Sequence, residues 1–134
     1  MATRRIDYRM QRRALLAEVR DGLKSKADVC DAHPNLVRAG EHLGDDVAKD
    51  CPICDEPDGL RHVMYVFHRR GKSAQGGRAI ASKNVAAELA KHGSIRRFIV
   101  EVCLHCHWNH LIEAAHLESP ARQRSRAVPR RTQG

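Results

Sequence analysis

The sequence predicts an α+β fold in which helices come first and a small antiparallel sheet follows. Three observations support this prediction. Apolar residues recur at helical spacing in the first third of the chain, runs of β-branched and aromatic residues appear only after residue 60, and two Cys-x-x-Cys pairs flank the second part. With 134 residues and only 4% aromatic residues, two small units in one chain would each need support such as a bound metal.

The first predicted helix runs from Tyr8 to Leu23, where apolar residues lie three or four positions apart with arginines between them. Gly22 weakens its last turn. Ser25 and Asp28 form a capping-box pattern, which predicts a second, short helix at about residues 26–32. The first part of the chain is therefore helical.

A third helix is predicted to begin at Pro34, because proline is favoured in a first turn, and to stop at Gly44. Three short helices with tight connections resemble a helix-turn-helix unit. Two interpretations stay open: the unit reads DNA, or it is a packing platform for the rest of the chain. The side chains available for reading DNA are Asn35, Arg38 and His42.

Two runs rich in β-branched and aromatic residues predict strands at Leu60–His68 and Phe98–Val102. Residues 108–117 alternate between polar and apolar and predict a third strand, with a helix as the alternative. A glycine-rich, basic loop at 69–78 separates the first two strands. It is followed by a helix at about 83–92 that begins after a serine and ends at a glycine.

The two cysteine pairs, Cys51/Cys54 and Cys103/Cys106, are the strongest functional signal in the chain. A spacing of two residues lets a tight turn direct both sulfurs at one tetrahedral ion, and four thiolates without a redox partner favour a single zinc. A shell closed by four thiolates leaves no position for water or substrate, so the ion would be structural. Paired cysteines next to strands predict a zinc-ribbon-type sheet, enlarged by the inserted loop and helix.

Other interpretations of these residues stay open. The two pairs could be unrelated, with one of them a redox dithiol, although the surrounding βαβ pattern of thioredoxins is missing. Three histidines close to the second pair in the sequence are candidate substitute ligands: His105, His107 and His110. Because four cysteines already complete the shell, we expect the histidines to support the ligands or to be exposed. Cys30 is expected to be a small buried apolar residue.

The net charge of +8 is concentrated at the two ends. Residues 1–13 carry five arginines against Asp7, residues 118–134 carry five against Glu118, and residues 14–117 are balanced. Such arginine-rich ends lack the apolar content to order alone, and we expect them to act as arms on a nucleic acid. The predicted contacts, with those of the internal loop, are Arg4, Arg5, Arg9, Arg12, Arg13, Arg69, Arg70, Lys72, Arg78, Arg122, Arg124, Arg126, Arg130 and Arg131.

The cysteine count and the hydropathy of the chain predict its compartment. Five cysteines, no signal-like start and no run of about 18 apolar residues predict a cytoplasmic protein without a membrane partner. No catalytic constellation, nucleotide-binding loop or dimer face is evident, so we expect a monomeric non-enzyme without a small-molecule substrate. The expected division is a helical unit with a basic arm (1–44), a linker (45–50), a zinc-ribbon unit (51–117) and a disordered arginine-rich tail (118–134).

Two resemblances extend this view. The segment Cys103-Leu-His-Cys106-His107 resembles the closing part of the HNH nuclease family, which would imply nuclease activity involving His107 and His110. The upstream candidates, His62 and His68, lack the neighbours that the general base of that family has.

A second resemblance covers about residues 6–117. Its motifs are Tyr8-Arg-Met-Gln-Arg12-Arg13-Ala-Leu15-Leu16, Asp28-Val-Cys30-Asp-Ala-His33-Pro34, Cys51-Pro-Ile-Cys54 and Val102-Cys103-Leu-His-Cys106-His-Trp108-Asn109-His110-Leu111. Together they resemble a small actinobacterial family of uncharacterised zinc-ribbon proteins. This resemblance implies the fold and the compartment but no activity.

The function that these observations favour is association with a nucleic-acid machine, either the ribosome or RNA polymerase, as an accessory or regulatory factor whose basic arms bind phosphates. Three alternatives remain: a helix-turn-helix transcriptional regulator, a protein–protein adaptor whose tails are only solvated, and an HNH-like nuclease.

Overall fold

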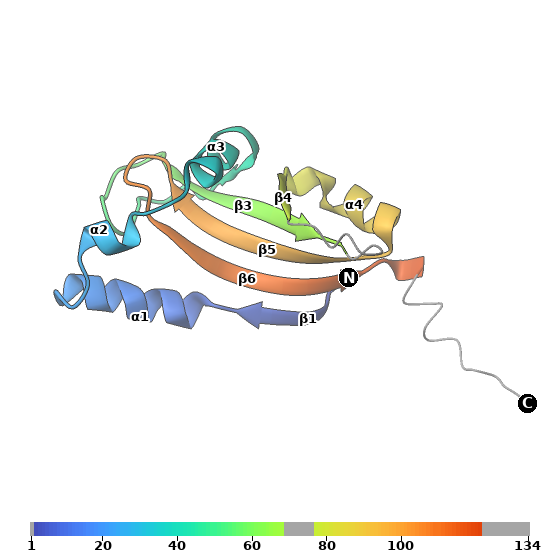
Figure 1. The fold of residues 1–134 in the computed structure, drawn as a ribbon, viewed down its shortest axis with the longest axis horizontal. Coiled ribbons are helices and arrows are strands. Elements are labelled where there is room, and N and C mark those ends of the chain that lie inside the picture. The colour runs from blue at the N-terminus through green and yellow to red at the C-terminus, as the bar shows by residue number, and fades with distance from the viewer. Residues whose placement is uncertain (1, 69–76, 122–134) are drawn as a thin grey trace, which may run out of the picture.

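The computed structural model describes residues 2–68 and 77–121, and in these ranges helices pack around one antiparallel sheet (Figure 1). Neighbouring strands follow the order β1-β6-β5-β3-β2, and β4 also pairs with β3. The predicted α+β class is confirmed. The elements in chain order are β1 (Ala2–Asp7), α1 (Arg9–Arg20), α2 (Lys26–Val29), α3 (Pro34–Leu43), β2 (Asp45–Asp46), β3 (Leu60–Phe67), β4 (Arg78–Ile80), a 3-10 turn (Ser82–Asn84), α4 (Val85–His92), β5 (Ser94–Cys103) and β6 (Asn109–Glu118).

The centre of the sheet is formed by β3, β5 and β6, and the three strands predicted from the sequence are confirmed there. On β5, Ile99 pairs with Glu113 and Val100 pairs with Leu111, so Ile112 is an extra residue in a β-bulge. Ile112 is 2% exposed. The bulge lets β6 keep buried side chains on both sides of this irregularity.

One face of the sheet carries two apolar cores. Side chains alternate along a strand, so residues an even number of positions apart share a face. The cysteine-end core lies where β3 begins and β5 ends, and residues of α1 pack against it. The α4-end core lies at the other end of the same strands. The cysteine-end core comprises Val29, Cys51, Ile53, Leu60, Cys103 and Trp108. The α4-end core comprises Val66, Ile80, Leu89, Ile95, Ala115 and Leu117.

The opposite face of the sheet is covered by α3 near the cysteine end. A Cβ added to Gly40 of this helix would lie 2.9 Å from Cγ1 of Val102 and 3.1 Å from Cδ2 of Leu104. Only a glycine therefore lets the helix approach the sheet this closely. Beyond α3, this face carries half-buried apolar side chains from β3 and β5.

The predicted three-helix unit is not confirmed, because α1 and α3 pack on opposite faces of the sheet and α2 is a single turn. The prediction that the basic N-terminal segment is an arm is also not confirmed. Residues 2–7 form β1, which pairs with β6, and the predicted linker contributes β2, which pairs with β3. A charged segment can be an edge strand because side chains on an edge strand reach solvent.

The helices of the described residues are all too short or too polar to cross a membrane. The predicted loop residues from 69 to 76 and the arginine-rich tail from residue 122 onward lie outside the described ranges.

Candidate metal centre

Two turns at one end of the sheet bring together the four cysteines predicted as ligands. Cys51 and Cys54 lie in the turn before β3, Cys103 is the last residue of β5, and Cys106 lies in the turn before β6. Their four Sγ atoms all lie within 4.8 Å of one another. Among residues 2–68 and 77–121, they are the one group of three or more ligating side chains this close together.

The backbone of the two turns is the same. The amide of Asp55 donates to the carbonyl of Cys51 (2.9 Å), and the amide of His107 donates to the carbonyl of Cys103 (3.0 Å). Both closing residues have left-handed backbones, with φ of 62° at Asp55 and 71° at His107. Two matching turns that face each other place two pairs of sulfurs on opposite sides of one point.

Backbone amides also donate to the sulfur of the first cysteine in each turn. The amide of Ile53 lies 3.3 Å from Sγ of Cys51, and the amide of His105 lies 3.4 Å from Sγ of Cys103. These N–H···S contacts favour thiolate over thiol. Such contacts stabilise the negative charge that the sulfurs need in order to bind a cation.

The sulfur spacing fits a tetrahedral zinc. A Zn–S bond of about 2.3 Å requires sulfurs about 3.8 Å apart at the corners of a tetrahedron. Sγ of Cys51 lies 3.8 Å from Sγ of Cys106, and Sγ of Cys54 lies 3.8 Å from Sγ of Cys103. The four cysteines can therefore bind one metal ion, with each turn supplying two ligands.

Burial shapes the acidity of these thiols. Cys51 and Cys103 are 1% and 0% exposed. Burial raises the pKa of Cys51 to about 11 and raises the pKa of Cys106. Burial by itself would also raise the pKa of Cys103. Hydrogen bonds from the backbone amides of Cys106 and His105 outweigh this effect, so the pKa of Cys103 is lowered. A cation among the sulfurs would supply the charge that converts the remaining thiols to thiolates.

A fifth sulfur, from Cys30, touches this group, and the sequence did not indicate the contact. Sγ of Cys30 lies 3.6 Å from Sγ of Cys106, and Cys30 is half-buried. The segment that follows it is held to the second turn, because the amide of Ala32 donates to the carbonyl of His107 (3.0 Å). The odd number of cysteines was the available signal, but nothing local indicated where the fifth would lie.

Of the three histidines near the second pair, His105 and His110 make contacts with their rings. The ring of His105 lies against Gly59, where an added Cβ would be 2.3 Å from the ring, and its Nε2 lies 3.2 Å from the carbonyl of Pro57. It thereby joins the two turns. His107 is exposed, and the ring of His110 stacks near Trp108 with centroids 5.9 Å apart.

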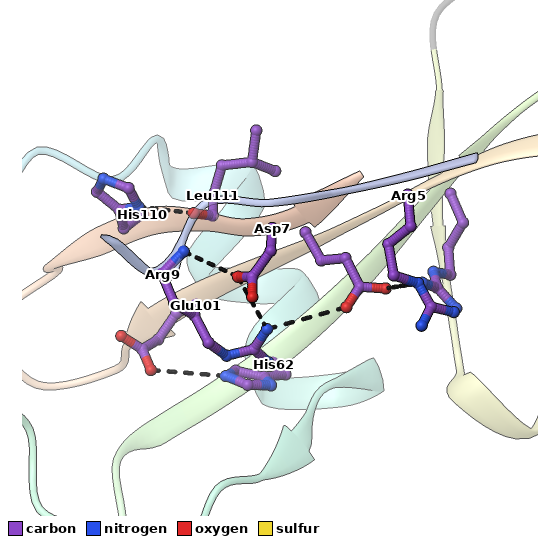
Figure 2. A network of polar contacts seen from close by, with 9 residues as sticks. Arg5, Asp7, Arg9, His62, Glu101, His110 and Leu111 are labelled. Carbon is purple, nitrogen blue, oxygen red and sulfur yellow. Dashed lines mark hydrogen bonds and ion pairs between the residues drawn. The ribbon is translucent and has the colours of Figure 1, made fainter. Parts of the chain in front are cut away.

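A buried carboxylate fastens α1 to the second turn. Glu101 is 3% exposed and accepts hydrogen bonds from Nε of Arg12 (2.7 Å) and Nε1 of Trp108 (3.0 Å). Nε2 of His62 lies 3.5 Å from its other oxygen (Figure 2). Burial by itself would raise the pKa of Glu101, but the bonds from His62, Trp108 and Arg12 hold it at about 2.

A second carboxylate binds three more arginines on the same face of the sheet. Glu113 is ion-paired with Nε of Arg5 (3.2 Å), with Nη1 of Arg9 (3.9 Å) and with Arg97. Arg9 also donates to Asp7. These contacts join β1, β5 and β6 across the sheet.

The structure thus separates the arginines that the sequence grouped together as nucleic-acid contacts. Arg5, Arg9 and Arg12 are ion-paired with acids of the sheet. Arg78 begins β4 and is ion-paired with Glu88 (2.6 Å). Arg4 and Arg13 are exposed. The remaining predicted contacts, Arg69, Arg70, Lys72, Arg122, Arg124, Arg126, Arg130 and Arg131, lie outside the described residues.

The nuclease alternative requires a helix after the second cysteine pair, whereas residues 109–118 form β6. His110 lies on that strand, and its Nδ1 is 2.6 Å from the carbonyl of Leu111 (Figure 2). The resemblance to the HNH family is therefore limited to the sequence of the turn.

Comparison with known proteins agrees with the resemblance seen in the sequence. A family of unknown function, DUF5318, matches residues 1–131. Uncharacterised proteins of Mycobacterium tuberculosis and Mycobacterium bovis are each 36% identical over 109 residues, which cover 81% of this chain and 78% of the relative. No solved structure matches significantly. The chain belongs to the DUF5318 family, whose function is unknown.

Proposed function

We propose that this protein is a non-enzymatic nucleic-acid-binding protein whose fold is stabilised by one zinc ion, and that it acts as an accessory or regulatory factor of the ribosome or RNA polymerase. The observation that carries the zinc assignment is the set of four Sγ atoms within 4.8 Å of one another, supplied by two matching turns. Four thiolates complete the shell of a zinc ion, and a closed shell is typical of a structural site.

The distribution of positive charge supports the nucleic-acid assignment. The net charge is +8, and two of the basic segments join the sheet at the end opposite the cysteines. The internal basic segment follows β3, which ends at Phe67, and the arginine-rich tail follows β6, which ends at Glu118 (Figure 1). Positive segments joined to one end of a sheet provide several phosphate contacts on the same polyanion.

Metal analysis tests the zinc assignment. Protein purified from its native host without added metal should contain one zinc per chain, and removal of that zinc by a strong chelator should unfold the cysteine end. A matched sample of the Cys51→Ser variant should contain no zinc. Folded wild-type protein that contains no metal would refute the assignment.

Binding to labelled oligonucleotides at increasing salt tests the nucleic-acid assignment. We expect the affinity to fall steeply with salt, because neutralised phosphates release counterions. A variant ending at Ala121 should lose part of the affinity and show a shallower salt slope. If the full chain binds no oligonucleotide at low salt, and its partners in lysate survive nuclease treatment, the protein is an adaptor instead.

A further inference from the structure

We propose that the open part of the α3-covered sheet face binds single-stranded nucleic acid by stacking bases on its aromatic side chains. This proposal rests on the nucleic-acid binding proposed above and names the surface and the class of ligand. We call this surface the aromatic face. It comprises Arg4, Tyr65, Phe67, Arg96, Phe98 and His116.

Aromatic side chains are scarce in this chain, and most of them lie together on this face. The chain has two Phe, two Tyr and one Trp, and three of these five rings occupy β3 and β5 beyond α3. Tyr65 is the direct cross-strand partner of Phe98. The rings of Phe67 and Phe98 meet edge to face, with centroids 5.3 Å apart. All three are half-buried, so part of each remains exposed to solvent.

Two adjoining hollows mark the aromatic face, and Phe98 lines both. The apolar hollow, of about 370 Å³, is lined by the three rings and by side chains of Leu36, Val100 and Leu111. The larger one, of about 710 Å³, includes Arg4, Arg96 and His116. An apolar floor with cations at its side is suited to a ligand that has flat apolar rings and a negatively charged backbone.

Arg4 and Arg96 are aligned across the strands, on either side of His116. Arg4 of β1 pairs with His116 of β6, which pairs with Arg96 of β5. The guanidinium of Arg96 lies over the ring of Phe98, 5.6 Å from its centroid. The row that holds Arg4, His116 and Arg96 is therefore next to the row that holds Phe98 and Tyr65. Bases on the rings would place their phosphates beside this row.

The arginines of the aromatic face differ from those of the core-bearing face in their partners. On the core-bearing face, Arg5, Arg12 and Arg97 are each ion-paired with a carboxylate of the sheet. On the aromatic face, neither Arg4 nor Arg96 is ion-paired with any residue in the described ranges. The acid in this hollow, Glu118, is buried and lies 3.5 Å from His116. The charge on this face therefore complements an anion.

Single strands fit this surface better than duplexes or proteins. Unpaired bases can leave their own stack and lie on protein rings, whereas the bases of a duplex are covered by their neighbours. A protein partner that filled the apolar hollow would leave the cations of the adjoining row without acids unless it carried matching carboxylates. A single strand satisfies both features, because it has rings and charge in every nucleotide.

The test uses the full chain and labelled twelve-nucleotide single strands of RNA and DNA, with an abasic strand of equal length as the probe for phosphate contacts alone. Fluorescence anisotropy at low salt measures each affinity. We expect wild-type protein to bind the strands with bases at least about tenfold more tightly than the abasic strand, because each stacked base adds to the affinity.

Variants locate the contact. The double variant Tyr65→Leu/Phe98→Leu keeps apolar volume and removes two rings, so it should lose at least about tenfold in affinity for strands with bases and keep its affinity for the abasic strand. Arg96→Gln should weaken the binding of both the strands with bases and the abasic strand, and it should reduce the slope of log affinity against log salt concentration by about one. Arg20→Gln, on an exposed helical position, is the charge-matched control. It should change neither the affinity for any strand nor the preference for strands with bases over the abasic strand. Zinc content and thermal unfolding of each variant report folding.

The outcomes separate the two proposals. If wild-type protein binds no strand, the proposed function itself fails. If it binds strands with and without bases equally, or if Arg96→Gln behaves like Arg20→Gln, nucleic-acid binding stands but the aromatic face does not take part. Tighter binding of duplex than of single strands would also overturn this inference. The wild-type comparison and the exposed Arg96 variant remain decisive even if the double variant does not fold.

Discussion

The two ends of the sheet are built from the same strands but are stabilised differently. At the α4 end, aliphatic side chains from a helix and several strands pack together, with Leu89 and Ile95 8% and 1% exposed. At the cysteine end, two turns and a short helix replace much of that regular structure, and buried sulfurs complete the core around Trp108. Apolar burial stabilises an end made of strands and helices. An end made of turns needs cross-links between them, and a metal ion bound by the four cysteines would supply these.

The largest effect is expected from removing one sulfur of the metal centre. Cys103→Ser should abolish zinc binding, and with it a binding free energy of roughly 10 kcal/mol or more. Hydrogen exchange should show residues 51–60 and 103–109 losing protection, while residues 94–98 and 114–118 remain measurably protected. A Cys103→Ser protein that keeps both zinc and protection at the cysteine end would contradict the contrast between the two ends.

Truncating the α4-end core should cost less and leave the metal in place. Leu89→Ala removes a side chain that is 8% exposed, and we expect a loss of about 3 kcal/mol in the free energy of unfolding. Urea titration gives this value, and metal analysis of the same sample should still give one zinc per chain. Loss of zinc from Leu89→Ala would mean that the two ends are a single cooperative unit.

Neutralising the buried carboxylate should have an intermediate effect at the cysteine end. Glu101→Gln preserves shape but removes the charge that pairs with Arg12, so we expect a loss of about 2 kcal/mol at neutral pH. Denaturant titration measures it. The control is Glu41→Gln, because the side chain of Glu41 is 57% exposed and its pair with His42 should contribute almost nothing. Equal effects of the two variants would show that the Glu101 network does not fasten α1.

The smallest effect is expected at the fifth sulfur. Cys30→Ala should retain one zinc per chain and change the free energy of unfolding by about 1 kcal/mol or less, because Cys51, Cys54, Cys103 and Cys106 suffice as ligands. Cys106→Ala is the matched comparison and should lose the metal. If Cys30→Ala loses zinc and Cys106→Ala retains it, Cys30 is the fourth ligand.

Several elements were predictable because their signals are local. The runs that became β3, β5 and β6 are rich in β-branched and aromatic residues. The second helix has the capping box that the sequence indicated, with Ser25 accepting from the amide of Asp28 (3.1 Å). The cysteine pairs were predictable for the same reason, since two residues of spacing determine how a turn presents two sulfurs.

Other features could not be predicted because they depend on contacts between distant residues. Residues 2–7 have the composition of a solvated basic segment, and they form a strand because β6 offers an edge on which Arg5 meets Glu113. Helices expected to form a unit of their own instead pack on opposite sides of the sheet, and the close approach of Gly40 to Val102 shows where α3 does so.

By itself, the sequence determined the helical segments, the three central strands, the two pairs of sulfurs and the excess of arginine. The tertiary structure decided which of these groups meet. It paired Arg12 with Glu101 and brought the thiol of Cys30 beside that of Cys106. Strand register placed Phe98 opposite Tyr65 and next to the row that holds Arg96. Helical and strand propensities act over a few residues, whereas register and layer order are set by packing between segments far apart in the chain.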